Sequence, residues 1–179
     1  MTIESFLLKS EGEWKSMRSG HSLAFQQFEE VISQIKITIL KLTDSKVSAL
    51  LSSIPLQTGI PTTPFRMAWN AESDWEPDDP NQVSSGECIL IPIKQSENNG
   101  LLIRSIGYAE SEQAISKYKL LNDDTFTLST EYGQSVAEER IWFISPNVRC
   151  RSSVLKTISG NGILQTSFSS EVRKLDLNG

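Results

Sequence analysis

The sequence predicts an all-β protein, an antiparallel up-and-down β-barrel of about ten strands, with a short N-terminal helix and one further short helix. Three observations predict it. From Gly12 onward, apolar and polar side chains alternate with a period of two. Strand-like runs recur about every 8–12 residues, and turn residues separate them. The alternation is one-sided in many successive runs, which favours a closed barrel without exposed edges; a β-sandwich is the alternative.

Two short stretches carry helix signals instead. The first, "TIESFLLKSEG", has Thr2 as its N-cap, and Gly12 ends it. The second, "DSKVSALLSS", has Asp44 as its N-cap. An apolar stripe on the first helix is formed by Ile3, Phe6 and Leu7. Both helices are therefore short, and the first can bury one face.

Two strands are predicted between the two helices. "GEWKSMRS" places Trp14, Ser16 and Arg18 on one side of a strand. "SQIKITILKL" places Ile35, Ile37 and Ile39 together on one side. After the second helix, "IPLQTGIPTTP" contains three prolines and is typical of a loop.

The rest of the chain consists of eight strand signals with turn residues such as "ENNG", "LNDD", "SPN" and "SGNG" between them. In the first of these, "FRMAWNAESDW", the side chains of Met67, Trp69 and Trp75 share one side. An acidic loop, "EPDDPNQ", follows it. The eight runs lie at residues 65–75, 86–94, 101–109, 114–121, 125–133, 137–145, 148–158 and 163–174.

Length and composition limit the possible functions. With 179 residues we expect one domain over residues 1–179, and a net charge of −5 disfavours nucleic acid as a partner. No apolar run is long enough to span a bilayer and no signal peptide is apparent, so we expect no membrane span and a place of action in the cytoplasm or a plastid stroma. With Cys88 and Cys150 as reduced thiols and His21 as the single histidine, no metal site is expected.

Arginines on the inner side of the barrel would need anions. If Trp14 faces inward, so does Arg18, and in a strand Arg149 and Arg151 share one side. An arginine buried without a partner costs several kcal/mol. The same interior could hold Met67, Trp69, Trp75, Tyr118, Tyr132 and Trp142. Either Glu138 or Glu139 pairs with the arginines, or a ligand with carboxylates and a preference for aromatic walls binds there.

Three residues also allow plain structural interpretations. Trp14 fits a core position better than a ligand contact. His21 is a modest candidate for proton transfer, and a loop or turn position is the commoner role of such a histidine. Cys150 lies between two arginines that could activate it, but strand parity turns it to the opposite face, where a structural thiol is expected.

Two long, irregular stretches, "FLLKSEGEWKSMRSGHSLA" and "EERIWFISPNVRCRSS", resemble the signature segments of the S-type phycobilin lyases, the CpcS/CpeS family. The similarity covers nearly the whole chain and includes the strand "MAWNAESDW" between them. It implies a lipocalin-like barrel, and the Gly12-x-Trp14 pair is similar to the opening motif of such barrels. The family binds an open-chain bilin such as phycocyanobilin and attaches it through a thioether to a cysteine of a phycobiliprotein subunit.

The resemblance implies a role for each matching residue. It assigns Arg18, Arg149 and Arg151 to the propionates or lactam oxygens of the bilin. Either Glu138 or Glu139 would hydrogen-bond the pyrrole nitrogens as the catalytic carboxylate, and His21 matches a family position of uncertain role. The walls of the bilin site would be formed by Met67, Trp69, Trp75 and Trp142.

The partners follow from the same resemblance. The bilin would be a substrate rather than a permanently bound cofactor, and the apo-phycobiliprotein subunit would supply the attacking sulfur. Two alternatives remain: a non-catalytic carrier of a carboxylated tetrapyrrole or fatty acid in the same barrel, and a subunit that is active only beside a related chain. A homodimer or a heterodimer is therefore possible.

Overall fold

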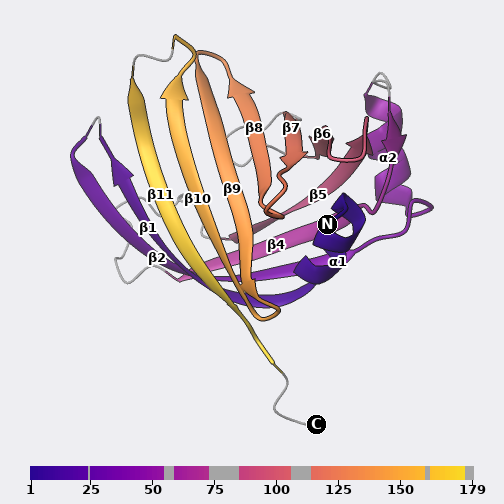
Figure 1. Cartoon of the computed structure of the whole chain (residues 1–179), viewed down its shortest axis with the longest axis horizontal. Coiled ribbons are helices and arrows are strands. Elements are labelled where there is room, and N and C mark those ends of the chain that lie inside the picture. Colours follow the sequence, from indigo (N-terminus) through magenta and orange to yellow (C-terminus); the bar gives the residue numbers. More distant parts are fainter. Residues whose placement is uncertain (24, 55–58, 73–84, 106–113, 160–161, 176–179) are drawn as a thin grey trace.

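The chain folds into a closed antiparallel barrel (Figure 1). The structure, a computed structural model, describes residues 1–23, 25–54, 59–72, 85–105, 114–159 and 162–175. In this part of the chain, ten strands are hydrogen-bonded in the order β5-β4-β2-β1-β11-β10-β9-β8-β7-β6, and β6 pairs again with β5. That last pairing closes the sheet, so the prediction of a barrel is confirmed and the sandwich is excluded.

The strands follow the predicted runs closely. β2 begins earlier than the sequence suggests, at Gln27, because the stretch "QFEEVI" alternates less clearly. The short β3 is an addition at the edge of β5, in the proline-rich segment that was expected to be a loop. The bounds are β1 Gly12–Ser22, β2 Gln27–Ile39, β3 Ile60–Pro61, β4 Phe65–Glu72, β5 Ser85–Lys94, β6 Asn99–Arg104, β7 Ala114–Leu120, β8 Phe126–Tyr132, β9 Ser135–Ser145, β10 Val148–Thr157 and β11 Ile163–Arg173.

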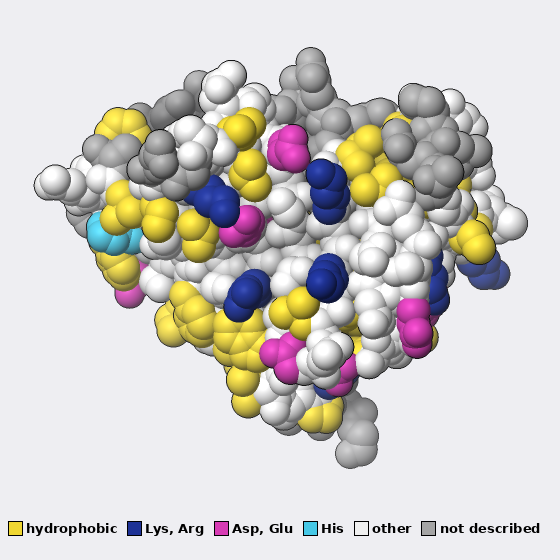
Figure 2. All heavy atoms as spheres, turned by 45° about the horizontal axis from the view of Figure 1, so that its top comes forward, with side chains coloured by type: hydrophobic (Ala, Val, Ile, Leu, Met, Phe, Trp, Pro, Cys, Tyr) yellow, Lys and Arg dark blue, Asp and Glu magenta, His cyan; other side chains and the backbone are white. Residues whose placement is uncertain are grey.

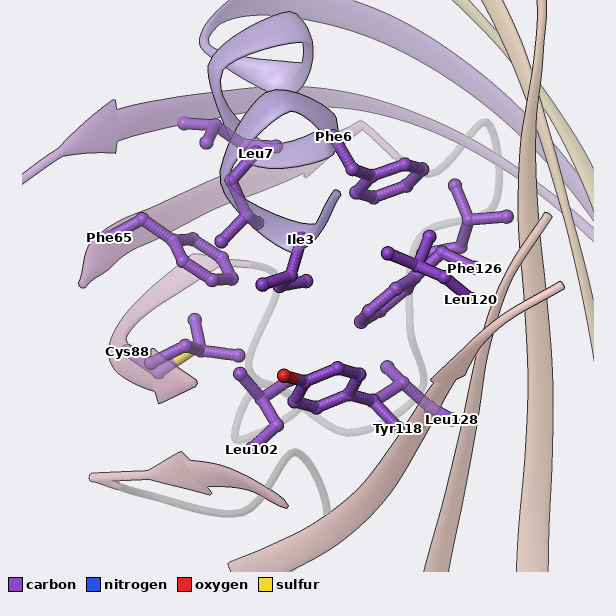
Figure 3. Close-up of a cluster of buried hydrophobic side chains, with 13 residues drawn as sticks. Ile3, Phe6, Leu7, Phe65, Cys88, Leu102, Tyr118, Leu120, Phe126 and Leu128 are labelled. Atoms are coloured by element: carbon purple, nitrogen blue, oxygen red, sulfur yellow. The ribbon is translucent and has the colours of Figure 1, made fainter. Parts of the chain in front are cut away.

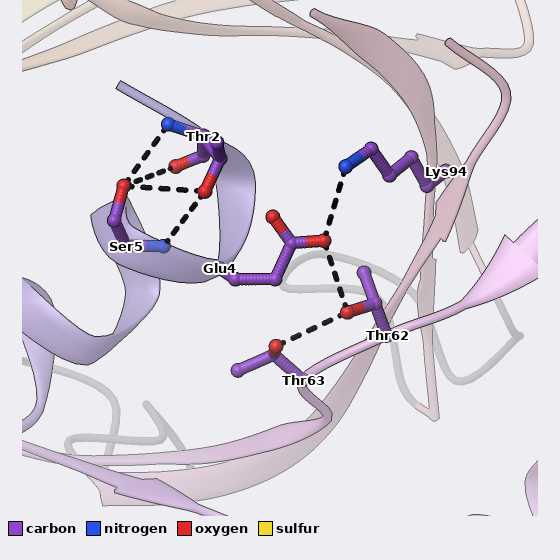
Figure 4. A network of polar contacts seen from close by, with 6 residues as sticks. All are labelled: Thr2, Glu4, Ser5, Thr62, Thr63 and Lys94. Atoms are coloured by element: carbon purple, nitrogen blue, oxygen red, sulfur yellow. Dashed lines mark hydrogen bonds and ion pairs between the residues drawn. The ribbon is translucent and has the colours of Figure 1, made fainter. Parts of the chain in front are cut away.

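Helix α1 (Ile3–Ser10) fills one end of the barrel. Thr2 caps it as predicted, with a reciprocal bond to Ser5, and Glu4 joins it to β5 through Lys94 at 3.4 Å (Figure 4). Its apolar stripe packs against inward side chains from the strands that surround it (Figure 3). This cluster, the plugged end, contains Ile3, Phe6, Leu7, Ile37, Phe65, Cys88, Leu90, Leu102, Tyr118, Leu120, Phe126, Leu128 and Ile141.

Trp14 completes the plugged end. Its side chain is 1% exposed, and its indole nitrogen donates to the carbonyl of Ser10, the last residue of α1. Arg173 packs on the same indole, 4.2 Å from its centroid, and donates to the carbonyls of Lys9 and Glu11. The expectation that Trp14 is a core residue is thus confirmed by its burial.

Helix α2 (Ser45–Ser53), capped by Asp44 as predicted, covers the outer face of β5 and β6. Six consecutive residues of β5, from Cys88 to Ile93, are buried because one face of the strand meets the interior and the other meets α2. This explains the unbroken apolar run "CILIPI". The second cluster, outside the barrel, consists of Val47, Leu50, Ile54, Ile89, Ile91, Ile93 and Ile103.

Some expectations lie outside the described residues, among them the acidic loop at 76–82 and the end of the predicted strand at 65–75, with Trp75. Within the described ranges, none of the helices has the length and apolar character needed to cross a membrane.

Candidate functional site

A row of side chains crosses the inner surface of the barrel, away from the plugged end. Ser169 of β11 lies directly opposite Arg18 of β1 and directly opposite Arg151 of β10. Residues opposite each other in register share a face, so both arginines point inward with Trp14 and Ser169. Two strand spacings separate them, which is about 10 Å between their backbones. The sequence prediction that Arg18 and Arg151 share the interior is therefore confirmed in geometry.

This part of the interior is open to water. The inward side chains of Arg18 and Arg151 keep 31% and 30% of their surface exposed. An inward side chain can retain such exposure only where the interior is not filled by packing. The space-filling view of this end of the molecule shows Lys and Arg side chains on both sides of a central band of uncharged polar atoms (Figure 2). Asp and Glu side chains lie on the same face (Figure 2), and Arg18 and Arg151 are each within 4 Å of a carboxylate, that of Glu29 and that of Glu139.

The two candidate carboxylates lie on opposite faces of β9. Glu139 is opposite Ser153 of β10, and its Oε2 lies 3.5 Å from Nη2 of Arg151 inside the barrel. Glu138 points outward, where it pairs with Lys156 at 2.7 Å and is half exposed. The motif alone left this choice open. Of these two glutamates, Glu139 is the one whose side chain faces the interior.

Trp69 and Met67 of β4 form one wall. They lie opposite Gly86 and Cys88 of β5, on the inner face. The indole of Trp69 lies flat over Gly86, since a Cβ built at that glycine would be 2.5 Å from Trp69 Cζ2. Gly86 is therefore the residue that allows a large ring to lie along the wall.

Arg104 of β6 also points into the barrel, and the sequence did not predict it. Its Nη2 donates to Ser116 Oγ and Thr130 Oγ1, both at 2.9 Å, and to the Tyr132 hydroxyl at 3.2 Å. The two small hydroxyls also bond each other at 2.7 Å. Strand parity could have predicted this, because Arg104 lies two residues after the inward Leu102.

Cys88, the member of the plugged end that lies opposite Met67, has an unreactive thiol. It is 6% exposed, and burial raises its pKa to about 11, while the positive charges of Arg104 and Arg151 partly offset that increase. At neutral pH the Cys88 thiol is protonated and a poor nucleophile.

Arg149 requires a correction. Its guanidinium Nε lies 2.5 Å from Oε2 of Glu171, and the two side chains are 6% and 2% exposed. The guanidinium also packs on the ring of Trp14, 4.5 Å from the centroid, at the plugged end. An internal carboxylate therefore neutralises this arginine, as one alternative held, but the partner comes from β11 rather than from the two glutamates of β9. We do not retain Arg149 among the ligand-facing residues.

Trp142 and His21 also require a correction of placement. Trp142 lies between the inward Ile141 and Phe143 of β9, so it points outward, where its ring contacts Phe168 at 6.1 Å. His21 is exposed on the outer face of β1, within a strand rather than in a loop. Cys150 faces outward as well, in line with its parity, and burial raises its pKa.

Comparisons with known proteins identify the family of this chain. A model of the family described as CpeS-like protein matches residues 2–174. A chromophore lyase CpcS/CpeS 3 from Trichodesmium erythraeum (strain IMS101) is 48% identical over 97% of this chain and 99% of its own length. A phycocyanobilin lyase subunit CpcS from Picosynechococcus sp. (strain ATCC 27264 / PCC 7002 / PR-6) is 30% identical, over 88% of this chain and 79% of its own.

A solved structure extends the similarity to the fold. The S-type phycobiliprotein lyase CPES from Guillardia theta superposes with a TM-score of 0.82 at 37% identity, covering 98% of this chain and 94% of that chain. At this identity and coverage the likeness extends over nearly the whole of both chains and includes their sequences as well as the fold. The chain belongs to the CpeS-like family.

Proposed function

We propose that this protein is a bilin lyase, which binds an open-chain bilin inside its barrel and presents it to a cysteine of an apo-phycobiliprotein subunit. The observation that carries the proposal is the pair of inward, water-accessible arginines, Arg18 and Arg151, beside the Trp69 wall. The curated relatives bear the names of chromophore lyases, which supports the same activity.

Binding combines apolar contact with charge recognition. A bilin is a flat conjugated molecule with two propionates. Burying about 400 Å² of it contributes on the order of 10 kcal/mol at ~25 cal/mol per Å², less several kcal/mol for lost freedom. Trp69 and Met67 supply part of this contact. Arg18 and Arg151 take carboxylates, because a guanidinium fork matches a carboxylate in two parallel hydrogen bonds.

Glu139 is the carboxylate that we assign to the pyrrole nitrogens. Its ion pair with Arg151 at 3.5 Å is loose, so it can turn toward a protonated bilin. A protonated bilin withdraws electrons from its ethylidene group, and the acceptor thiol then adds across that double bond. The sulfur bonds to the ethylidene carbon, the thiol proton ends on the adjoining ring carbon, and nothing leaves.

The attacking sulfur belongs to the acceptor. Burial raises the pKa of Cys88 to about 11, and Cys150 faces away from the interior, so neither thiol of this chain suits the task. Catalysis then consists of holding the bilin in one geometry next to the acceptor cysteine.

The identity of the bilin, the place of action and the number of chains belong to the same proposal. The bilin is phycocyanobilin or a related bilin, used as substrate and not retained. The place of action is that of the phycobiliproteins, in the cytoplasm or the plastid stroma. A second chain, as a homodimer or beside a related subunit, is an option because one relative is named as a subunit.

The test is a transfer reaction. Purified protein, phycocyanobilin and an apo-phycobiliprotein subunit are mixed, and zinc-enhanced fluorescence is measured on a denaturing gel. Fluorescence on the acceptor band is expected, and it should be absent when the acceptor cysteine is replaced by serine. Pigment that stays with the barrel and never reaches any of a panel of acceptor subunits, with and without a related lyase chain, would instead indicate a carrier.

A further inference from the structure

Arg104 is held inside the barrel by uncharged groups alone. All its hydrogen bonds run from Nη2 to three hydroxyls, those of Ser116, Thr130 and Tyr132. A guanidinium has five N–H hydrogens, and only two of them are on Nη2. The three hydrogens on Nε and Nη1 engage no acceptor within the described ranges, and Nε is buried.

Its charge is likewise unbalanced. In the part of the chain that the structure describes, no carboxylate lies within ion-pair distance of Arg104, whereas Arg18 and Arg151 each have one. Hydroxyls fix the orientation of a guanidinium but do not neutralise it. A half-buried cation with spare donors is costly unless an anion arrives to accept them.

The position of Arg104 makes it complementary to the other arginines. In the closed ring of strands, β7, β8 and β9 separate β6 from β10, so Arg104 and Arg151 project from distant walls. Both side chains nevertheless face the barrel interior, since Arg104 lies two residues after the inward Leu102 and Arg151 lies opposite the inward Ser169.

We propose that Arg104 binds one carboxylate of the bilin while Arg151, with Arg18 beside it, binds the other. This inference rests on the proposed function and deepens it. Two carboxylates held from two walls fix the rotation of the pigment about the barrel axis, which a single charged wall leaves free. The hydroxyl cradle holds the Arg104 guanidinium in the required orientation before the ligand arrives, so little side-chain entropy is lost on binding.

The test compares phycocyanobilin with its dimethyl ester, in which both carboxylates are blocked. We expect wild-type protein to bind the diacid about a hundredfold more tightly than the diester, and Arg104→Gln and Arg151→Gln each to lower this ratio about tenfold. The double variant should lower the ratio further than either single variant, because contacts to different carboxylates add, and Arg18 retains the remaining preference for the diacid. Arg66→Gln, on the outer face of β4, is the matched control and should keep the wild-type ratio.

A structural role for Arg104 would move the unfolding midpoint but not the diacid-to-diester ratio, so a wild-type ratio in folded Arg104→Gln overturns the inference. Should that variant fail to fold, Arg104→Met keeps the length of the side chain and is judged by the same ratio. A double variant no weaker than either single variant would mean that both arginines bind one carboxylate, which also overturns it. Failure of the wild-type protein to bind or transfer the bilin would refute the proposed function itself, and this outcome is distinct from a wild-type ratio in Arg104→Gln.

Discussion

The guanidinium of Arg149 lies 2.5 Å from the carboxylate of Glu171, in a position where neither side chain is more than 6% exposed. The pair packs on Trp14 at the plugged end, one same-face position along β10 and β11 from the row that joins Arg18 and Arg151. Two arginines that are neighbours by parity on β10 thus have different tasks. Arg149 is buried against Glu171, whereas Arg151 faces the water-accessible part of the interior.

Removing one partner of the buried pair should destabilise the protein. Glu171→Gln leaves the Arg149 guanidinium without its counterion, and we expect the free energy of unfolding to fall by about 3–5 kcal/mol in urea titrations. Glu13→Gln, which breaks the exposed pair with Lys36, is the control and should cost under ~1 kcal/mol. If the free energy of unfolding of Glu171→Gln falls no more than that of the control and the variant loses bilin binding, Arg149 belongs to the ligand site.

The two adjacent glutamates provide a matched pair of variants. Glu139→Gln removes the inward carboxylate, and we expect the rate of bilin attachment to fall by about 10²-fold or more, as for loss of a general acid or base. Glu138→Gln changes the outward side chain, and its rate should remain within about twofold of wild type. Equal losses in both variants would contradict the assignment to Glu139. The measurement is the single-turnover rate with acceptor in excess.

A larger residue at position 86 should displace the indole ring of Trp69. In Gly86→Ala the new methyl group would lie 2.5 Å from the indole, so the ring must move toward the interior. We expect the visible absorption band of bound bilin to shift in this variant and in Trp69→Ala. Trp142→Phe, on the outer face, should leave the spectrum as in wild type. A shift in the Trp142 variant alone would place the bilin outside the barrel.

Stability should fall at high pH. Burial raises the pKa of Cys88 from 9.0 to about 11, so the folded state holds its proton more tightly than the unfolded state. The protonated Cys88 thiol therefore makes its full contribution to the free energy of unfolding below pH 9. This contribution, on the order of 2–3 kcal/mol, is lost as the pH rises from about 9 through 11. Tyr118, whose pKa burial raises to about 12, acts in the same direction at slightly higher pH.

Urea unfolding between pH 8 and 11 measures this effect. The difference between wild type and Cys88→Ala should shrink across that range, because the variant has no thiol to titrate in the unfolded state. A constant difference between the two proteins would show that the Cys88 pKa is close to its ordinary value.

Local patterns were sufficient for much of the fold. Thr2 and Asp44 cap the two helices as predicted, since a cap depends on neighbours three residues away. Alternation placed Arg18, Met67, Trp69 and Arg151 on the inner face for the same reason. Parity also set Glu138 and Glu139 on opposite faces, but it could not say which face was inside.

The sequence by itself determined the period of each strand, the helix caps and the family, because these are written in neighbouring residues and in long motifs. Only the tertiary structure decided which charges meet. Glu171 neutralises Arg149 through the register of β10 on β11, Glu139 rather than Glu138 meets Arg151, and Arg104 comes to face the same space across the closure of β6 on β5. The energy of an ion pair depends on a separation of a few ångströms. Such separations between residues far apart in the chain are fixed only once the barrel has closed.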